Sequence, residues 1–334
     1  MQALKEKLKK PPIQLAVLFG TLILFLITNA TLRDSPFGFL PLLLSILIVI
    51  EIFIFVGMEV KDGAEKHGWK HEVVDTVIAL LVAVMIWFGL SFVLNTGSPV
   101  SGVVSCSMLP NLQRGDFVVV QGAVPKAYEL NMTGDELDSL SSRSFVSYPG
   151  GNLSTDGSIF AYCLRNRNTD ACKAFISNPE SVREEKGAFT YRYERCNITY
   201  SSGSSATEPC LKSVIFKGKE YLTDFSNDIV VYQPLPGDLF SLVGDIVHRV
   251  LFRINAGGKT YYLTRGDNNP VLDLQVYDYA GGVGNHPVPA ERLRGKVIAR
   301  IPYLGYFKLF ISGYLNEDPQ CKTQLYFTHA NPAS

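Results

Sequence analysis

The sequence predicts a chain of two parts: N-terminal transmembrane helices, followed by a mainly-β extracytoplasmic domain that carries an inserted lobe. Three features lead to this prediction. Residues 1–97 contain three long apolar runs, and residues 98–121 and 227–315 contain short β-branched runs between turn residues. Residues 122–226, between those two segments, are rich in Ser, Gly, Thr and Asn with scattered apolar pairs. We assign them to the inserted lobe, and residues 316–334 to a C-terminal tail.

The composition excludes two classes of protein. Hydrophobic residues make up 47% of the 334 residues, and 31 basic side chains balance 31 acidic ones. A disordered chain has fewer apolar residues and a larger net charge, so disorder of the bulk of the chain is excluded. A balanced charge argues against a large basic face, and we therefore expect no nucleic-acid partner.

The apolar runs cover about residues 13–30, 37–58 and 73–94. Each is close to the roughly 20 residues that a helix needs to cross a bilayer. Buried helices of a soluble protein would carry polar stripes, and the second and third runs carry almost none. The first run is long for the core of a cleaved signal peptide, and two more runs follow it, so we interpret it as a retained span. These features predict an integral membrane protein with a three-helix anchor.

Charged residues beside the runs predict the orientation in the membrane. The N-terminal side and the loop between the second and third runs are rich in lysine, whereas the loop after the first run has Arg33 against Asp34. The lysines are Lys5, Lys7, Lys9, Lys10, Lys61, Lys66 and Lys70. By the positive-inside rule, the N-terminus and the second loop are cytoplasmic. Three crossings then place everything after the third run outside the cytoplasm.

The cysteines agree with this topology. An even set lies in the predicted lobe, at Cys163, Cys172, Cys196 and Cys210, and such sets are typical of disulfides outside the cytoplasm. Three pairings are possible, and proximity favours Cys163 with Cys172 and Cys196 with Cys210. Metal binding is disfavoured because the set lacks a Cys-x-x-Cys pair. Glycosylation sequons, usable only on this face, begin at Asn131, Asn152 and Asn197.

Two segments carry candidate catalytic groups. Ser107 lies in the segment Ser105–Pro110, about 13 residues after the third run, which keeps it within about 45 Å of the membrane surface. His248 lies on the apolar face of a strand predicted over residues 245–254, with Arg249 and Arg253 on the other face. Taken alone, a histidine in this position is more often a core residue than a catalytic one.

A predicted hairpin brings acidic residues to this histidine. A four-residue turn at 255–258 leads into a second strand, which places His248 opposite Arg265 to within about two positions. The loop after that strand carries Asp267 and Asp273. A nucleophilic serine needs a neighbouring base, and the base needs a group that fixes its tautomer. Ser107, His248 and an aspartate of this loop can fill these three roles.

Four segments, in this order, resemble the conserved boxes of type I signal peptidases. They are Ser105-Cys106-Ser107-Met108-Leu109-Pro110, Asp228-Ile229-Val230-Val231-Tyr232, Ile246-Val247-His248-Arg249-Val250 and Gly266-Asp267-Asn268-Asn269. A histidine in the third box is similar to the archaeal and endoplasmic-reticulum branch, since most bacterial enzymes have lysine there. Residues 296–309 resemble the closing strand of the family. The resemblance covers roughly residues 100–121 and 227–309 and implies a signal-peptidase-like (LexA-like) catalytic domain.

The resemblance also implies roles for single residues. Ser107 would be the nucleophile, His248 the general base, and Asp267 and Asp273 the acidic pair; we expect Asp273 to orient His248, although the sequence leaves these two roles exchangeable. Ser105 matches the serine whose hydroxyl, with the Ser107 backbone N–H, holds the oxyanion. Small-residue pockets for the substrate would be formed by Val103, Val104, Met108, Ile229 and Val231. No cofactor or metal is expected, because no motif for one is visible.

The implied function is that of a membrane-bound signal peptidase, which cleaves preproteins after small residues through an acyl-enzyme. The implied partners are preprotein signal peptides, the lipid bilayer and the protein translocation machinery, and the location is the cell membrane, or the endoplasmic reticulum membrane in a eukaryote. Two alternatives stay open. One is a membrane-anchored binding or envelope protein on an inactive peptidase scaffold. The other is a specialised processing peptidase.

The chain departs from the family pattern in three places. Cys106 and Asn227 stand where the family usually has glycine, and Cys106 is tolerable only if the backbone there avoids positive φ. Ser107 and His248 are 141 residues apart, where the family usually has a few tens. The insertion accounts for this spacing and is expected to decorate the core for substrate or partner contacts. Cys321, in the tail, either pairs with Cys106 or stays free.

Overall fold

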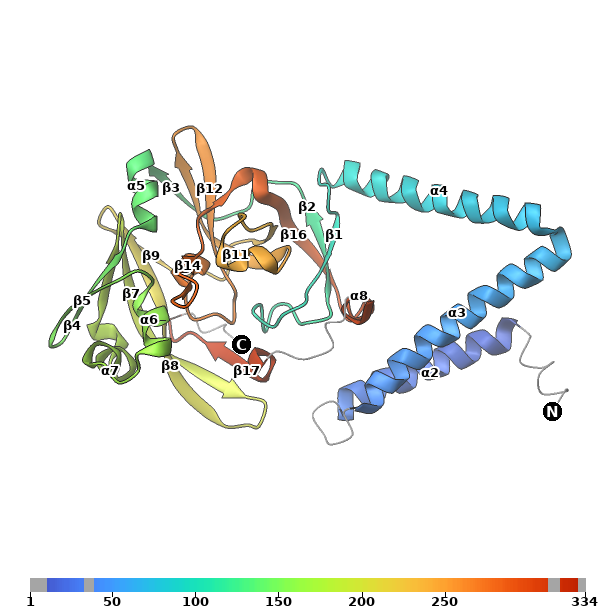
Figure 1. The fold of residues 1–334 in the computed structure, drawn as a ribbon, viewed down its shortest axis with the longest axis horizontal. Helices are drawn as coiled ribbons and strands as arrows, with labels where there is room; N and C mark the ends of the chain where they lie inside the picture. Colours follow the sequence, from blue (N-terminus) through green and yellow to red (C-terminus); the bar gives the residue numbers. More distant parts are fainter. Residues whose placement is uncertain (1–10, 33–38, 312–318, 330–334) are drawn as a thin grey trace. The chain divides into compact units, whose positions relative to one another are not determined.

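The computed structural model describes residues 11–32, 39–311 and 319–329 (Figure 1). The chain divides into two compact units, Met1–Ile86 and Trp87–Ser334, and each is described by itself. The basic residues that precede the first apolar run, and Arg33 and Asp34 after it, lie outside the described residues. The predicted orientation in the membrane therefore stays a prediction.

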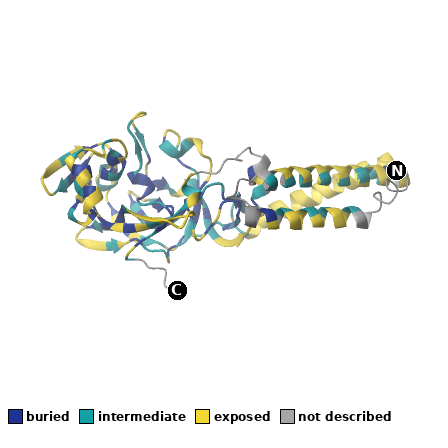
Figure 2. Ribbon diagram, turned by 90° about the horizontal axis from the view of Figure 1, so that it is seen from below, coloured by how far each residue is buried: buried dark blue, intermediate teal, exposed yellow. Residues whose placement is uncertain are grey.

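Helices form at all three apolar runs: α2 spans Pro11–Leu32, α3 spans Phe39–His67 and α4 spans Trp69–Val93. Within the described residues, α4 is long and apolar enough to cross a membrane, and Gln14–Phe25 is a shorter apolar segment. Figure 2 shows that these helices are largely exposed, whereas buried residues are frequent in the second unit. Glu51 of α3 interrupts the apolar surface, and Thr21 of α2 donates a hydrogen bond to its carboxylate at 3.0 Å.

The second unit is built on two large sheets. The first has the order β1-β2-β16-β10-β11-β12-β15, all antiparallel, with β3 added parallel to β11. Its strands are β1 Val100–Gly102, β2 Phe117–Gln121, β3 Tyr128–Met132, β10 Ile229–Tyr232, β11 Ile246–Ala256, β12 Lys259–Arg265, β15 Val288–Pro289 and β16 Leu293–Ile301. The mainly-β character predicted for this part of the chain is confirmed.

The second sheet comes almost wholly from residues 122–226, with the order β5-β4-β6-β7-β8-β9 and β17 paired to β7. Its strands are β4 Ser144–Tyr148, β5 Gly151–Thr155, β6 Arg183–Lys186, β7 Phe189–Tyr200, β8 Ser205–Phe216, β9 Lys219–Leu222 and β17 Thr323–Tyr326. The remaining elements are α5 Gly134–Asp138, α6 Ile159–Arg165, α7 Asp170–Ser177, α8 Tyr306–Ile311, β13 Tyr277–Asp278 and β14 Val283–Gly284. Short 3₁₀ turns include η3 Leu239–Leu242, η4 Asp273–Gln275 and η6 Pro319–Lys322. A strand of the C-terminal tail thus completes the sheet of the lobe.

The β11–β12 hairpin differs in detail from the predicted one. Its turn consists of two residues, Gly257 and Gly258, whose φ angles of 56° and 76° suit the tight turns of hairpins. Ile254 consequently faces Tyr261, not Lys259. A bulge between Val250 and Phe252 then changes the register, so that Arg249, and not His248, faces Arg265.

The lobe and the first sheet share one hydrophobic core. Buried residues from both sheets form a single cluster, and the ring of Phe189 on β7 stacks on Phe252 of β11 with centroids 5.7 Å apart. Tyr221 of β9 meets the same Phe252 edge-on at 5.4 Å. The lobe therefore packs directly behind the hairpin that carries His248, and removing it would expose the core of the first sheet.

Three disulfides tie the second unit together. Cys163–Cys172 links α6 to α7 and Cys196–Cys210 links β7 to β8, as proximity in the sequence predicted. The third, Cys106–Cys321, joins the segment before Ser107 to the tail over a separation of 215 residues. Glu194 lies beside Cys196 and Cys210, but the two sulfurs are bonded to each other and so provide no thiolates for a metal.

Glu208 on β8 gives the lobe a pH-dependent stability. Burial raises the pKa of its carboxyl from 4.5 to about 7. The native state keeps a proton that the unfolded chain releases at lower pH, so stability that is present below about pH 4.5 is lost as the pH rises through about 7. We expect Glu208→Gln to raise Tm at pH 8 and to leave it nearly unchanged at pH 4, as thermal unfolding would measure. An equal increase at both pH values would contradict this origin.

Candidate active site

Ser107 lies in a tight turn between β1 and β2. The turn is closed by backbone hydrogen bonds from Leu109 to Cys106 at 3.3 Å and from Leu112 to Met108 at 3.0 Å. Cys106 is not among the described residues with positive φ, so the backbone accepts a side chain where the family usually has glycine. The Ser105 hydroxyl lies 3.1 Å from the Ser107 hydroxyl. Both predicted serines are therefore next to each other in the folded chain.

His248 connects this turn to the acidic loop. It lies on β11 opposite Val230 of β10 and is 5% exposed. Its Nε2 atom is 3.0 Å from Ser107 Oγ, and its Nδ1 atom is 2.7 Å from Asp273 Oδ2. A carboxylate only accepts hydrogen bonds, so the network assigns the proton to Nδ1 and leaves Nε2 free to accept from the serine. Three residues that are distant in sequence thus form one chain of hydrogen bonds.

Asp273 is held by more groups than the sequence indicated. Its Oδ2 atom also accepts hydrogen bonds from the Tyr232 hydroxyl at 2.9 Å and from the Thr264 hydroxyl at 2.6 Å. Burial, together with the negative charge of Asp273, raises the pKa of Tyr232 well above its ordinary value, so Tyr232 remains a donor. Sequence reasoning missed Tyr232 and Thr264, although both belong to strands beside His248. Strand alternation could have indicated Tyr232. It lies two positions after Val230, the residue opposite His248, so its side chain is on the same face of the sheet as that of Val230.

Asp267 has a different position from Asp273. Arg249 binds it with two parallel hydrogen bonds of 2.7 Å, from Nε and Nη2, and the side-chain amide of Asn111 donates a third of 2.7 Å. The carboxylate is fully buried, and its hydrogen bonds go to these groups and not to His248. The structure therefore separates the two aspartates: Asp273 contacts the histidine, and Asp267 ties the acidic loop to β11 and to the segment after Ser107.

Asn268 joins the acidic loop to the serine turn and to the tail. Its backbone N–H donates to the Ser107 carbonyl at 2.7 Å, and its side-chain amide donates to the carbonyls of Cys106 at 3.2 Å and Thr323 at 2.9 Å. Its side-chain oxygen accepts from the backbone of Leu325 at 2.7 Å. Together with the Cys106–Cys321 disulfide, these bonds fix the tail against the turn that carries Ser107.

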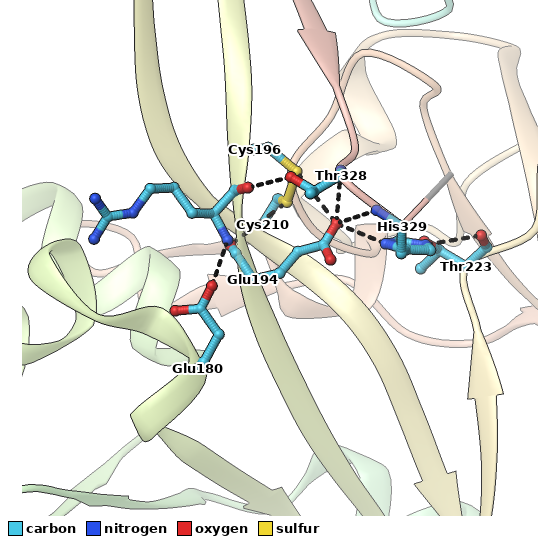
Figure 3. Close-up of a disulfide and its surroundings, with 8 residues drawn as sticks. Glu180, Glu194, Cys196, Cys210, Thr223, Thr328 and His329 are labelled. Carbon is cyan, nitrogen blue, oxygen red and sulfur yellow. Dashed lines mark hydrogen bonds and ion pairs between the residues drawn. A yellow bond between two sulfur atoms is a disulfide. The ribbon is translucent and has the colours of Figure 1, made fainter. Parts of the chain in front are cut away.

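Thr328 and His329 of the tail are anchored on the lobe, as Figure 3 shows. Glu194 of β7, beside the Cys196–Cys210 disulfide, accepts hydrogen bonds from the His329 ring at 2.6 Å and from the Thr328 backbone at 3.0 Å. Burial raises the pKa of Glu194, but these bonds outweigh it and hold the pKa below its ordinary value. The tail therefore bridges the serine turn and the lobe.

A cavity of about 190 Å³ opens beside Ser107 and His248. Val103 and Val104, for which the resemblance implies a substrate pocket, line it together with Phe240 and Val243, from η3 and the residue after it. Met108, Ile229 and Val231 do not line it. They pack in a neighbouring core cluster with Leu112, Val118 and Val120. No motif marked residues 233–245, so sequence reasoning could not find Phe240 and Val243.

Comparison with known proteins gives the following relatives. No protein-family model matches the chain. The chain is similar to the signal peptidase complex catalytic subunit sec11 of Sclerotinia sclerotiorum, with 34% identity over 96 residues, which are 29% of this chain and 48% of that protein. The corresponding subunit of Verticillium alfalfae is 32% identical over 96 residues, with the same coverage. An uncharacterized protein of Methanocaldococcus jannaschii is 24% identical over 231 residues, 65% of this chain and 85% of that protein.

The chain spans about half the length of the catalytic subunits that it matches. The archaeal protein is matched over most of its own length, at lower identity. The relatives come from fungi and an archaeon, which agrees with a histidine in the third conserved box. These similarities confirm the predicted resemblance of the chain to type I signal peptidases of the archaeal and endoplasmic-reticulum branch.

Proposed function

We propose that the protein is a membrane-bound serine endopeptidase that removes signal peptides from translocated preproteins. The observation that carries the proposal is the hydrogen-bond chain from Ser107 through His248 to Asp273, with links of 3.0 and 2.7 Å. A nucleophile, a base and a group that orients the base are the elements that acyl transfer by a serine requires. The similarity to catalytic subunits of signal peptidase complexes supports the substrate class.

The geometry suggests the following steps. His248 Nε2 accepts the Ser107 hydroxyl proton as Oγ attacks the scissile carbonyl carbon, and Asp273 stabilises the imidazolium that forms. The Ser105 hydroxyl and the Ser107 backbone N–H donate hydrogen bonds to the oxyanion. His248 then protonates the leaving amine, which leaves the signal peptide esterified to Ser107. A water molecule, deprotonated by the same histidine, hydrolyses this ester and restores the serine.

Specificity and location follow from the surroundings of the site. The cavity of about 190 Å³ beside Ser107, walled by Val103 and Val104, suits a small side chain before the cleaved bond. The helices α2, α3 and α4 would anchor the protein in the bilayer, with the catalytic unit outside the cytoplasm or in the lumen of the endoplasmic reticulum. Since the fungal relatives are subunits of a signal peptidase complex, we propose that this chain also joins such a complex, next to the translocation machinery, and that its own Ser107, His248 and Asp273 suffice for cleavage.

Direct cleavage tests this function. The purified full-length protein, in detergent, is incubated with a preprotein whose signal peptide ends in Ala-x-Ala, and the product is identified by sequencing its new N-terminus. We expect a single cut after the last alanine. The matched control has leucine in place of that alanine and should remain uncut. Absence of cleavage, or cleavage of both preproteins at the same rate, would refute the proposal.

The Cys106–Cys321 disulfide should support activity. Because it fixes the residue next to Ser107, we expect Cys106→Ala/Cys321→Ala to lower kcat by roughly tenfold, in line with the effect of small misplacements of catalytic groups. The control is Cys163→Ala/Cys172→Ala, which opens a disulfide within the lobe. Both enzymes are compared by kcat for the folded fraction. An equal loss in the two variants would mean that the first disulfide acts only through general stability.

A further inference from the structure

The loop that carries Asp273 is held at both ends by the lobe. At its start, the backbone N–H of Leu211 on β8 donates a hydrogen bond to the carbonyl of Pro270 at 2.7 Å. At its end, the side-chain amide of Gln275 donates to the Tyr193 hydroxyl of β7 at 2.8 Å. Asp273 thus lies between two attachments that the first sheet does not provide.

Gln275 transmits the second attachment to Asp273. It is completely buried, and its side-chain oxygen accepts the backbone N–H of Leu272 at 3.1 Å, which closes the short turn η4 around Asp273. Its backbone carbonyl accepts from the Ser158 hydroxyl, at the start of α6 in the lobe, at 2.6 Å. Lobe residues therefore hold Gln275, the last residue of η4, through both its side chain and its backbone carbonyl.

Tyr193 is itself held in one orientation. Its hydroxyl donates to Glu184 of β6, which also accepts from the Ser144 hydroxyl at 2.8 Å and the Ile159 backbone at 3.1 Å. Burial raises the pKa of Tyr193 well above its ordinary value, so the hydroxyl keeps its proton. With that proton directed at Glu184, the oxygen lone pairs remain for the Gln275 amide. The result is a buried polar network in which each hydrogen bond fixes the next.

Resting on the proposed function, we propose that Tyr193 and Gln275 are positioning residues for Asp273, and that the lobe serves to set the catalytic hydrogen bond between Asp273 and His248. The substrate pocket is built from other residues, among them Val103 and Val104. Loosening η4 therefore changes the placement of the aspartate and leaves the pocket intact. This role differs from the substrate or partner contacts expected for the insertion.

The chain offers a matched control. Tyr191 lies on the same strand and is as deeply buried as Tyr193, but its hydroxyl has no hydrogen-bond partner among the described residues. Tyr193→Phe and Tyr191→Phe therefore remove the same atom from the same core, and only the first removes the link to Gln275. We expect Tyr193→Phe to lower kcat for an Ala-x-Ala preprotein by about tenfold with unchanged KM, since displacement of a catalytic group by about 1 Å can lower the rate about 100-fold. Tyr191→Phe should keep the wild-type kcat.

A double-mutant cycle separates positioning from general stability. Gln275→Met removes the hydrogen bonds to Tyr193 and to the Leu272 backbone with little change of size. In that background Tyr193→Phe should have no further effect on kcat, because the link from Tyr193 to η4 is already lost. Wild-type kcat in Gln275→Met, or additive losses in the double variant, would overturn the proposal. If Tyr193→Phe does not fold, Gln275→Met alone tests the proposal. A lower kcat at unchanged KM supports it, and the wild-type kcat overturns it. A wild-type protein without any cleavage would instead refute the proposed function, so the two failures are distinguishable.

Discussion

Ser107→Ala is expected to abolish preprotein cleavage, with kcat reduced by at least about 10⁴-fold. Without Oγ no acyl-enzyme can form, and His248 has no hydroxyl to deprotonate. The serine is a small side chain in a turn fixed by the neighbouring backbone, so its removal should leave the fold intact. The measurement is the single-turnover rate with an Ala-x-Ala preprotein, together with Tm of both proteins.

Ser105→Ala is the matched control for this variant. Its hydroxyl lies 3.1 Å from that of Ser107 but would only donate to the oxyanion, so we expect a smaller loss of about 10²–10³-fold. Accumulation of an acyl-enzyme should persist in Ser105→Ala and be absent in Ser107→Ala. Substantial cleavage by folded Ser107→Ala would remove Ser107 from the mechanism and favour a protein that binds its partner on an inactive scaffold.

Replacement by asparagine should mainly lower kcat at Asp273 and mainly lower stability at Asp267. Asp273→Asn removes the charge that stabilises the imidazolium and disturbs the tautomer of His248, and we expect kcat to fall by about 10³–10⁴-fold. Asp267→Asn instead removes the negative charge and one of the two oxygens that accept hydrogen bonds from Arg249, a side chain that is only 11% exposed. Loss of one partner of a buried ion pair typically lowers stability by about 3–5 kcal/mol.

The measurement is kcat for the folded fraction and the free energy of unfolding, determined for each variant. Asp273→Asn should lose far more turnover per folded molecule than Asp267→Asn, whereas Asp267→Asn should keep most of the turnover of the folded molecules and lose the stability of the ion pair with Arg249. The reverse pattern would exchange the two roles and would make Asp267 the group that orients the histidine.

Local sequence patterns identified the site residues that lie in a motif or in a regularly alternating strand. Ser107 and His248 were found because a motif and an alternating strand mark them, and the structure places their side chains 3.0 Å apart. The resemblance could not show whether Met108, Ile229 and Val231 border the cavity, because that depends on how the turn and the strands pack in three dimensions. The bulge in β11 likewise has no clear signal in the sequence, and it changes the residue that faces Arg265.

Contacts between distant parts of the chain account for the remaining differences. The pairing of Cys106 with Cys321 joins residues 215 positions apart, and no local pattern distinguishes it from a free thiol. The packing of Phe189 on Phe252 is also a long-range contact. The composition of residues 122–226 indicated a separate decoration, but apolar residues scattered along β-strands collect in a shared core once the strands pair.

The attachment of the tail has a consequence for the maturation of the molecule. Cys321 and the strand β17 follow every other residue of the site along the chain, yet they fix the serine turn and complete the sheet of the lobe. Synthesis proceeds from the N-terminus, so Ser107, His248 and Asp273 emerge before the residues that hold them in register. A chain still under synthesis would therefore contain all three residues of the proposed hydrogen-bond chain but not yet the tail that fixes their geometry. Under the proposed function, proteolytic activity would appear only after β17 has paired with β7.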